Sequence, residues 1–391
     1  MIRLDSWKSY SSGPLQSHPS AVYNTVIMFD LSPEDFDLPP EQFEAKMAAL
    51  LADPAGAPVL MAYRSEVMSK ILSMTKAVKD TLVSRSEEVD VVAAGLLSGT
   101  SVLLMGPPGT AKSLLVRSVA QASGVNGERF FDYLISNHTM PEELFGSVDL
   151  SGLVEGKMRR VTQGKMPVAE VAFLDEVFRG GSHILNTLLT IINEKKYDSG
   201  EGLKPVPLLA VVGAANSPPD KEEMVAFFDR FPVRCWVDPL LDRPNPEKLE
   251  LQLLDKAISG DRKRLLSTWG RGKVKVSSPV ITTNHFRCGR TILHALLRDA
   301  SGKAAEKRWS EFIGMFHDCR AIARLSDRSL AQLWFFGAAL DFVRGMDPTQ
   351  PYDAASKSKQ SDGHLHVFRH VARSGQGRRG LSEKVSAFLA N

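Results

Sequence analysis

The chain has 391 residues, 43% of them hydrophobic and 24% charged, so it can bury a large core and is long enough for two or three domains. Its 48 Lys and Arg nearly balance 45 Asp and Glu, and the formal net charge of +3 argues against a basic coat for nucleic acid over the whole surface. Three distant cysteines without a CxxC pair argue against a disulfide framework or a zinc ribbon.

The first 62 residues are rich in Ser and Pro, and the sequence predicts a loosely packed N-terminal extension there. Its segments SPED and PPEQ are typical helix starts, with Pro and acidic residues in the first turn. The first 20 residues lack the apolar core of a signal peptide. No apolar stretch approaches the roughly 20 residues of a membrane span. We therefore expect a cytoplasmic protein without a membrane span.

The next segment, residues 63–97, has a helical pattern that ends at Gly99. One apolar stripe recurs at spacings of three and four residues and consists of Val67, Ile71, Met74, Val78 and Leu82.

Short apolar runs then alternate with helical segments. Such runs are typical of strands that are buried on both faces of a mainly parallel sheet, with helices in the crossovers. The sequence thus predicts a three-layer α/β core over residues 63–240, with a parallel five-stranded sheet. The expected strands are residues 101–105, 130–135, 171–174, 207–215 and 233–237.

Beyond residue 240 the pattern is almost wholly helical. We expect a linker and helix over 241–275, followed by a smaller all-helical domain with a basic C-terminal tail over 276–391. The polar segment 348–363 is predicted to be a loop, and 364–372 and 381–390 could each form one more helix.

The strongest motif is GPPGTAKS, which follows an expected buried strand and precedes an amphipathic helix. This strand–loop–helix context is the one that a P-loop requires. Lys112 would reach the β- and γ-phosphates of a nucleotide, and Ser113 would bind Mg²⁺. The expected nucleotide-binding residues are Gly106, Pro107, Pro108, Gly109, Thr110, Ala111, Lys112, Ser113 and Leu114.

One position departs from the P-loop pattern, because Ala111 stands where Gly normally precedes the lysine. Alanine is tolerable there if the residue has a right-handed helical conformation.

Two further expected strands end in polar side chains at the sheet edge where ligands bind in open α/β folds. Asp175 and Glu176 follow the strand at 171–174; Asp175 would hold Mg²⁺, and Glu176 would deprotonate the attacking water. Asn216 follows the strand at 207–215. Its amide could hold the water or the γ-phosphate, or it could simply be the turn residue, and spacing alone leaves both readings open.

Six motifs in order along residues 80–345 together resemble an AAA+ ATPase of the MoxR type, with RavA-like members as the nearest relatives. The motifs are GPPGTAKS, FLDE, NTLLTIINEKKY, AANSPP, FFDRFPVRCWVD and LSDRSL. The resemblance implies an AAA+ core and a helical lid, with ATP and Mg²⁺ as ligands.

The resemblance also implies roles for individual residues. Asn216 would be sensor 1, and Arg230 would be the arginine finger that reaches the γ-phosphate of a neighbouring subunit, with Arg234 as a competing candidate. Arg328 resembles sensor 2, by which the lid closes over the nucleotide. Segment 84–91 matches the stretch that lies against the adenine.

Two inserts complete the resemblance. Residues 144–170 are similar to the helix-2 insert and are predicted to form a hairpin, and residues 194–207 resemble a pre-sensor hairpin. In the family these loops face the pore of a ring. Lys157, Arg159 and Arg160 would then be pore-facing, although a solvated hairpin is an equal alternative for each.

The resulting hypothesis is a Mg-ATP-hydrolysing ring, a hexamer, that remodels or activates a partner protein, as a chaperone does. The resemblance implies a partner with a von Willebrand A domain. A nucleic-acid motor is one alternative, and a slowly hydrolysing, nucleotide-dependent assembly scaffold is another. The motor is favoured by the KMRR segment and by a basic tail that contains Lys357, Lys359, Arg369, Arg373, Arg378 and Arg379.

Overall fold

The computed structural model describes residues 31–219, 224–258, 281–299 and 325–349, with short pieces at 309–310, 312–314 and 316–317. The helices expected at 364–372 and 381–390 and the basic tail lie outside the described residues, as do residues 259–275 of the segment expected to be a linker and helix.

Five parallel strands form the central sheet in the order β2-β3-β6-β1-β7, which confirms the predicted parallel sheet. The strand β6 lies between β1 and β3. Because the three strands are parallel and adjacent, their carboxyl ends lie next to one another at the same edge of the sheet. The strands are β1 (Val102–Met105), β2 (Phe130–Leu134), β3 (Val171–Asp175), β6 (Ala210–Ala215) and β7 (Val233–Trp236).

The strand β2 differs from the expectation that every strand is buried on both faces. It pairs with β3 alone and forms one edge of the sheet, and Leu134 is 63% exposed. An edge strand has a neighbour on only one side, which the apolar run FFDYLI does not reveal.

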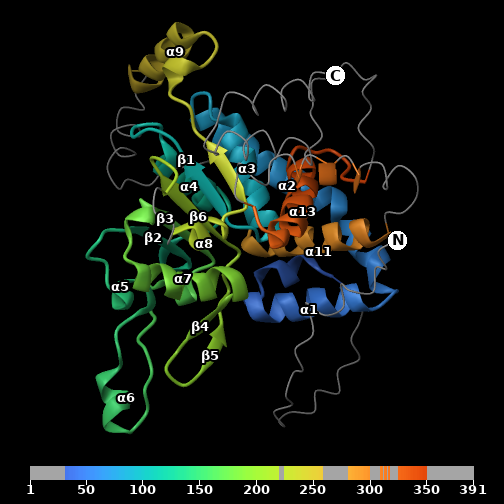
Figure 1. Ribbon diagram of the computed structural model, residues 1–391. Coiled ribbons are helices and arrows are strands. Elements are labelled where there is room, and N and C mark those ends of the chain that lie inside the picture. Colours follow the sequence, from blue (N-terminus) through green and yellow to red (C-terminus); the bar gives the residue numbers. More distant parts are fainter. Residues whose placement is uncertain are drawn as a thin grey trace. The chain divides into compact units, whose positions relative to one another are not determined.

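Helices cover both faces of the sheet, as predicted for a three-layer core (Figure 1). Alternate side chains of β1 enter two separate cores: Val102 and Leu104 enter one, Leu103 and Met105 the other. The first core is closed by α2 (Gly56–Thr81), α3 (Ser86–Ser98), α4 (Lys112–Ala122), α11 (Thr283–Asp299) and α13 (Asp327–Val343). The second is closed by α5 (Pro141–Phe145), α7 (Ser182–Glu194) and α8 (Val225–Phe228).

The helical pattern over 63–97 is interrupted in the structure. The helix α2 ends at Thr81 and α3 begins at Ser86, and between them Ser84 has a left-handed backbone with φ 53°. Gly99 ends α3 at φ 75°, in the left-handed conformation typical of a helix C-terminus, as predicted.

Residues 31–52 are packed, whereas the sequence predicts a loose extension. They form the short helix η2 (Pro33–Asp37) and α1 (Pro40–Ala52), whose apolar side chains Phe36, Phe43 and Met47 are at most 4% exposed. The Asn284 amide of α11 donates to the carbonyls of Phe36 and Leu38 at 3.1 and 2.8 Å. The segment is therefore part of the core that α2 and α11 share.

The helices of the C-terminal part pack directly on the N-terminal helices, α11 on α2 and α13 on α3. Arg287 of α11 also forms an ion pair at 3.0 Å with Glu170, the residue before β3. Among the described residues, no helix is long and apolar enough to cross a membrane.

Candidate active site

The phosphate loop leaves β1 at a position that only glycine can occupy. Gly106 has φ 154°, and a Cβ there would lie 2.3 Å from the carbonyl oxygen of Val237. At Gly109, φ is 78° and a Cβ would meet nothing within 4 Å. The loop therefore packs tightly against the end of β7 at Gly106, and it is open to solvent or a ligand at Gly109.

Ala111 does not have the right-handed conformation in which alanine would be tolerable at this position. Its backbone angles are φ 66° and ψ 24°, in the left-handed region, and α4 begins at the next residue. The left-handed conformation costs a residue with a Cβ about 1–2 kcal/mol of conformational free energy, and glycine would not have this cost. The path of the loop requires this conformation, so the backbone of Ala111 is strained.

Lys112 is the central cation of the loop. Its ammonium donates to the carbonyls of Gly106 and Pro107 at 2.7 and 2.9 Å and to Asn216 Oδ1 at 3.3 Å. Burial lowers the pKa of Lys112, while the charges of Asp175 and Glu176 act in the opposite direction. The ammonium thus sits where the ends of β1, β3 and β6 meet.

Ser113 and Asp175 form the oxygen pair expected to bind a metal. The Ser113 hydroxyl donates to Asp175 Oδ2 at 2.8 Å, although 62 residues separate them. A hydroxyl and a carboxylate oxygen are ligands that Mg²⁺ prefers.

Glu176 and Asn216 are also in contact. The Asn216 amide nitrogen donates to Glu176 Oε1 at 2.7 Å, and Arg179 forms an ion pair with Glu176 Oε2 at 3.4 Å. Glu176 has φ 53°, a strained conformation of the kind that clusters at functional sites. Because the other end of the Asn216 amide accepts from Lys112, this side chain bridges the phosphate loop and the candidate base.

These groups match the chemistry of a nucleoside triphosphate and its metal. The helix N-terminus of α4 and the Lys112 ammonium attract phosphates, and the open tip at Gly109 leaves room for a ligand. The oxygens of Ser113 and Asp175 suit Mg²⁺.

The two arginines proposed as finger differ sharply in burial. Arg234 is fully buried; it donates to the carbonyls of Phe231 and Phe228 at 2.9 and 3.2 Å and stacks on the Phe228 ring. Burial lowers its pKa to about 9. Arg230 retains 21% side-chain exposure and pairs with Asp229 at 3.1 Å. Of the two arginines, Arg230 alone has a partly exposed side chain.

Arg328, at the start of α13, lies beside Arg230. The preceding Ser326 donates its backbone N–H to Asp229 Oδ1 at 3.0 Å, which anchors α13 next to Arg230. Burial and the positive charge of Arg328 both lower the pKa of Arg230. Within the part of the chain that the structure describes, the side-chain hydrogen bonds of Lys112, Ser113 and Asp175 go to partners other than Arg328.

The sequence did not reveal the residues outside the phosphate loop that hold its backbone in place. Within segment 84–91, Arg85 donates through Nε to the Thr110 carbonyl at 3.2 Å, and Glu88 is paired with Arg243. Because 155 residues separate Glu88 and Arg243, no local pattern could have linked them.

The insert forms a hairpin-like loop, as predicted, but it pairs through one bridge, between Val148 and Arg160, and carries a short helix α6 (Leu150–Val154). Its basic side chains are engaged within it. Lys157 pairs with Glu155 at 3.6 Å, Arg159 with Asp149 at 2.7 Å, and Arg160 donates to the Gly146 carbonyl at 3.0 Å. The predicted pre-sensor hairpin is present as β4 (Lys196–Asp198) and β5 (Leu203–Pro205).

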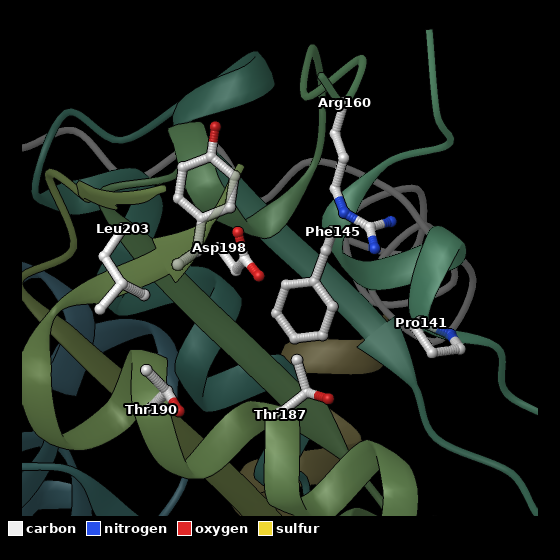
Figure 2. A pocket seen from close by; sticks show the side chains of 8 residues that line it. Pro141, Phe145, Arg160, Thr187, Thr190, Asp198 and Leu203 are labelled. Carbon is white, nitrogen blue, oxygen red and sulfur yellow. The ribbon is translucent and has the colours of Figure 1, made fainter. Parts of the chain in front are cut away.

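A cavity of about 460 Å³ lies between the insert, α7 and the β4–β5 hairpin. Figure 2 shows Phe145 and Arg160 of the insert facing Thr187 and Thr190 of α7. Its lining shares no residue with the cluster around Lys112.

Comparison with protein families settles which family this site belongs to. Residues 69–264, half of the 391, match the model described as the MoxR domain in the MoxR-vWA-beta-propeller ternary systems. The chain belongs to the MoxR family of AAA+ ATPases. The match spans the phosphate loop, Asp175, Glu176, Asn216 and Arg230.

Individual relatives agree with this assignment. An uncharacterized protein of Methanocaldococcus jannaschii is 39% identical over 186 residues, which are 47% of this chain and 48% of that protein. The chaperone MoxR1 of Mycobacterium tuberculosis is 26% identical over 283 residues, 71% of this chain and 70% of MoxR1. A Corynebacterium urealyticum protein named as an AAA ATPase forming ring-shaped complexes is 26% identical over 240 residues, 56% of this chain and 43% of that protein. The chain thus spans about half the length of the first of these relatives.

The fold is also found in a crystal structure of a Cytophaga hutchinsonii protein classed as an ATPase. The TM-score is 0.56 at 16% sequence identity, over 84% of this chain and 96% of the other. At this identity the likeness extends to the fold alone.

Proposed function

We propose that this MoxR-family protein hydrolyses Mg-ATP in a ring of identical protomers and uses the energy to remodel or activate a partner protein. The observation that carries the proposal is the convergence of Lys112, the Ser113–Asp175 pair and the Asn216–Glu176 pair at the ends of three adjacent strands. The phosphate-binding, metal-binding and proton-transfer groups are thereby linked by one chain of hydrogen bonds, which runs from Lys112 through Asn216 and Glu176 to the Ser113–Asp175 pair.

Each group has a distinct role in this proposal. Lys112 and the loop N–H groups bind the β- and γ-phosphates, and Ser113 and Asp175 hold Mg²⁺, which neutralises phosphate charge when bound. Glu176 accepts the proton of the attacking water, and Asn216 orients that water or the γ-phosphate. Both must be released from their mutual hydrogen bond to act.

Arg230 and Arg328 would act together on the site of a neighbouring protomer. They lie side by side, because Ser326 at the start of the same helix is hydrogen-bonded to Asp229, the neighbour of Arg230. A guanidinium supplied by another subunit stabilises the charge of the transition state. Hydrolysis would then require assembly, in agreement with the ring-forming name of one relative.

The partner that we propose contains a von Willebrand A domain. The support is the description of the matching family model, which names such proteins in the same systems, and the chaperone name of the relative from M. tuberculosis. The engaged basic residues of the insert give no support to a nucleic-acid motor.

The decisive experiment compares ATP binding and hydrolysis in the wild type and in Glu176→Gln. We expect unchanged ATP binding and a loss of hydrolysis of about 10²–10⁴-fold, the usual contribution of a general base. Glu194→Gln, which changes an exposed glutamate at the end of α7, is the control and should hydrolyse like the wild type. Wild-type hydrolysis in Glu176→Gln would refute the assigned mechanism, and retained biological function without hydrolysis would favour a scaffold.

The Glu176→Gln protein loaded with ATP also serves to find the partner. Recovery of a protein with a von Willebrand A domain would support the remodelling role. Recovery of DNA alone, with binding that falls steeply with salt, would replace it by the nucleic-acid motor.

A further inference from the structure

A buried ion cluster lies behind the phosphate loop, and no step of the proposed hydrolysis uses it. It consists of Arg85 and Glu88 at the start of α3 and of Arg243, which follows the short helix η7 (Leu240–Asp242). Arg85 is 4% and Glu88 1% exposed. Beyond η7 the chain continues into α9 (Pro246–Ile258) and then toward the C-terminal helices.

One side of the cluster touches the nucleotide loop. Arg85 donates through Nε to the Thr110 carbonyl at 3.2 Å, one residue before Ala111, and lies 3.7 Å from Glu88 Oε1. Glu88 thus helps to fix a guanidinium that holds the backbone of the loop.

The other side of the cluster holds the segment that leads to α9. Arg243 pairs with the same Glu88 oxygen through one guanidinium nitrogen and donates through the other to the Ser84 carbonyl and, at 3.2 Å, to the Ser84 hydroxyl. One carboxylate therefore joins two segments that are 155 residues apart in the chain.

The hydrogen bonding of this cluster is incomplete. Glu88 Oε2 and Arg243 Nε are buried and have no hydrogen-bond partner within the part of the chain that the structure describes. Unsatisfied buried polar atoms are costly, so a rearrangement of Arg243 could gain hydrogen bonds.

We propose that Glu88 is a positioning residue that couples the phosphate loop to the segment entering α9. Through Arg85 it holds the loop in its nucleotide-binding shape, and through Arg243 it passes a shift of the loop at Thr110 to residues 240–254. This coupling rests on the proposed ATP binding at Lys112. It gives the bound nucleotide a route to the C-terminal helices that does not involve Arg328.

The test measures two quantities on the full-length protein: ATP affinity, and the hydrogen exchange of the backbone amides of 240–254 with and without ATP. In the wild type, ATP is expected to slow exchange in both the phosphate loop and 240–254. In Glu88→Gln, we expect ATP to bind on the order of tenfold more weakly, because a charged partner of Arg85 is lost. Exchange in 240–254 should no longer respond to ATP.

Asp90→Asn is the matched control. Asp90 is a second buried carboxylate on α3, paired with Lys79 at 2.5 Å and Arg344 at 3.6 Å, and it does not contact the loop. Its loss should lower thermal stability but leave ATP affinity and the response of 240–254 intact. A merely structural role of Glu88 predicts the same result for both variants.

Arg243→Lys tests the coupling between the phosphate loop and residues 240–254 if Glu88→Gln does not fold. It keeps the charge but cannot span Glu88 and Ser84 at once, so it should abolish the response of 240–254 while the loop still responds. Unchanged affinity and an unchanged response in a folded variant would overturn the coupling. A wild type that binds no ATP would overturn the proposed function itself.

Discussion

Two residues of the active site have left-handed backbone angles although neither is glycine: Ala111 with φ 66° and Glu176 with φ 53°. For Glu176 the carboxylate is needed by the proposed chemistry, so the strain has a functional reason. Ala111 has no comparable reason, because its methyl group contributes nothing that the phosphates need.

Replacement of Ala111 by glycine is therefore expected to stabilise the protein. Relief of the left-handed strain outweighs the added freedom of the unfolded chain, and the free energy of unfolding in urea should rise by about 1 kcal/mol. Ala48→Gly in the right-handed helix α1, at an exposed position, is the control and should lower it by about 1 kcal/mol. A loss of stability in both variants would contradict the assigned conformation of Ala111.

Lys195 carries a buried amino group with a lowered pKa. Its ammonium is buried at the end of α7, without a hydrogen-bond partner among the described residues, and burial together with the charge of Arg290 lowers its pKa to about 7, although Glu44 acts in the opposite direction. Since the pKa in the unfolded chain is near 10.5, the unfolded state binds more protons between pH 7 and pH 10.5. This group thus makes the wild type more stable as pH rises through that window.

Lys195→Met should consequently be more stable than the wild type at pH 7. The difference should shrink as pH approaches 10, because the wild-type lysine is then neutral in both states. Thermal melts of both proteins at pH 7, 8, 9 and 10 measure this. A difference that is constant with pH would mean that the buried amine is not the cause.

At the scale of elements, η2 and α1 are packed against the core, although the sequence predicts a loose N-terminal extension. Phe36 is 4% exposed; its ring stacks on His285 of α11 at 4.2 Å and lies 5.4 Å from that of Phe43. The contact between Phe36 and His285 joins residues 249 positions apart in sequence, so the N-terminal part and α11 should unfold together.

Phe36→Ala tests this joint unfolding. We expect a loss of about 3–5 kcal/mol, the usual cost of deleting a buried phenyl ring, within one cooperative calorimetric transition. Leu241→Ala, at a side chain that is 69% exposed, should change stability by less than about 0.5 kcal/mol. An early separate transition for the N-terminal part would indicate that it is a loose extension after all.

For the whole molecule, the proposed ring makes a prediction about mixtures. Arg230→Ala and Glu176→Gln should each be nearly inactive alone, since each removes one half of every shared site. In a mixed ring, intact Glu176 of one protomer meets intact Arg230 of the next at about a quarter of the interfaces, if mixing is random and equal.

A recovery of about a quarter of the wild-type rate is thus expected on mixing. ATPase rates of the two variants, alone and combined at constant total protein, measure it. Arg234→Ala mixed with Glu176→Gln is the control: because Arg234 is buried within its own chain, its loss should show as instability of the variant itself. No recovery with Arg230→Ala would mean that Arg230 does not act in a neighbouring site.

The sheet and the phosphate loop were predictable from the sequence because both depend on local patterns. Apolar runs mark the buried strands, and glycines flank the turn before Lys112. The left-handed angle of Ala111 was not predictable, since the fit of the loop between β1 and α4 decides it. The finger role remains a prediction, but burial now separates Arg230 from Arg234, and burial is set by tertiary packing.

The order of the strands has one more consequence. Since β6 runs between β1 and β3, the amide of Asn216 contacts Lys112 on one side and Glu176 on the other. A ligand that draws the ammonium toward itself would remove one of the two anchors of that amide. The Glu176 carboxylate would then be released from the Asn216 amide only when a ligand occupies the loop, so the water-activating group would become available only in a protomer that has bound nucleotide.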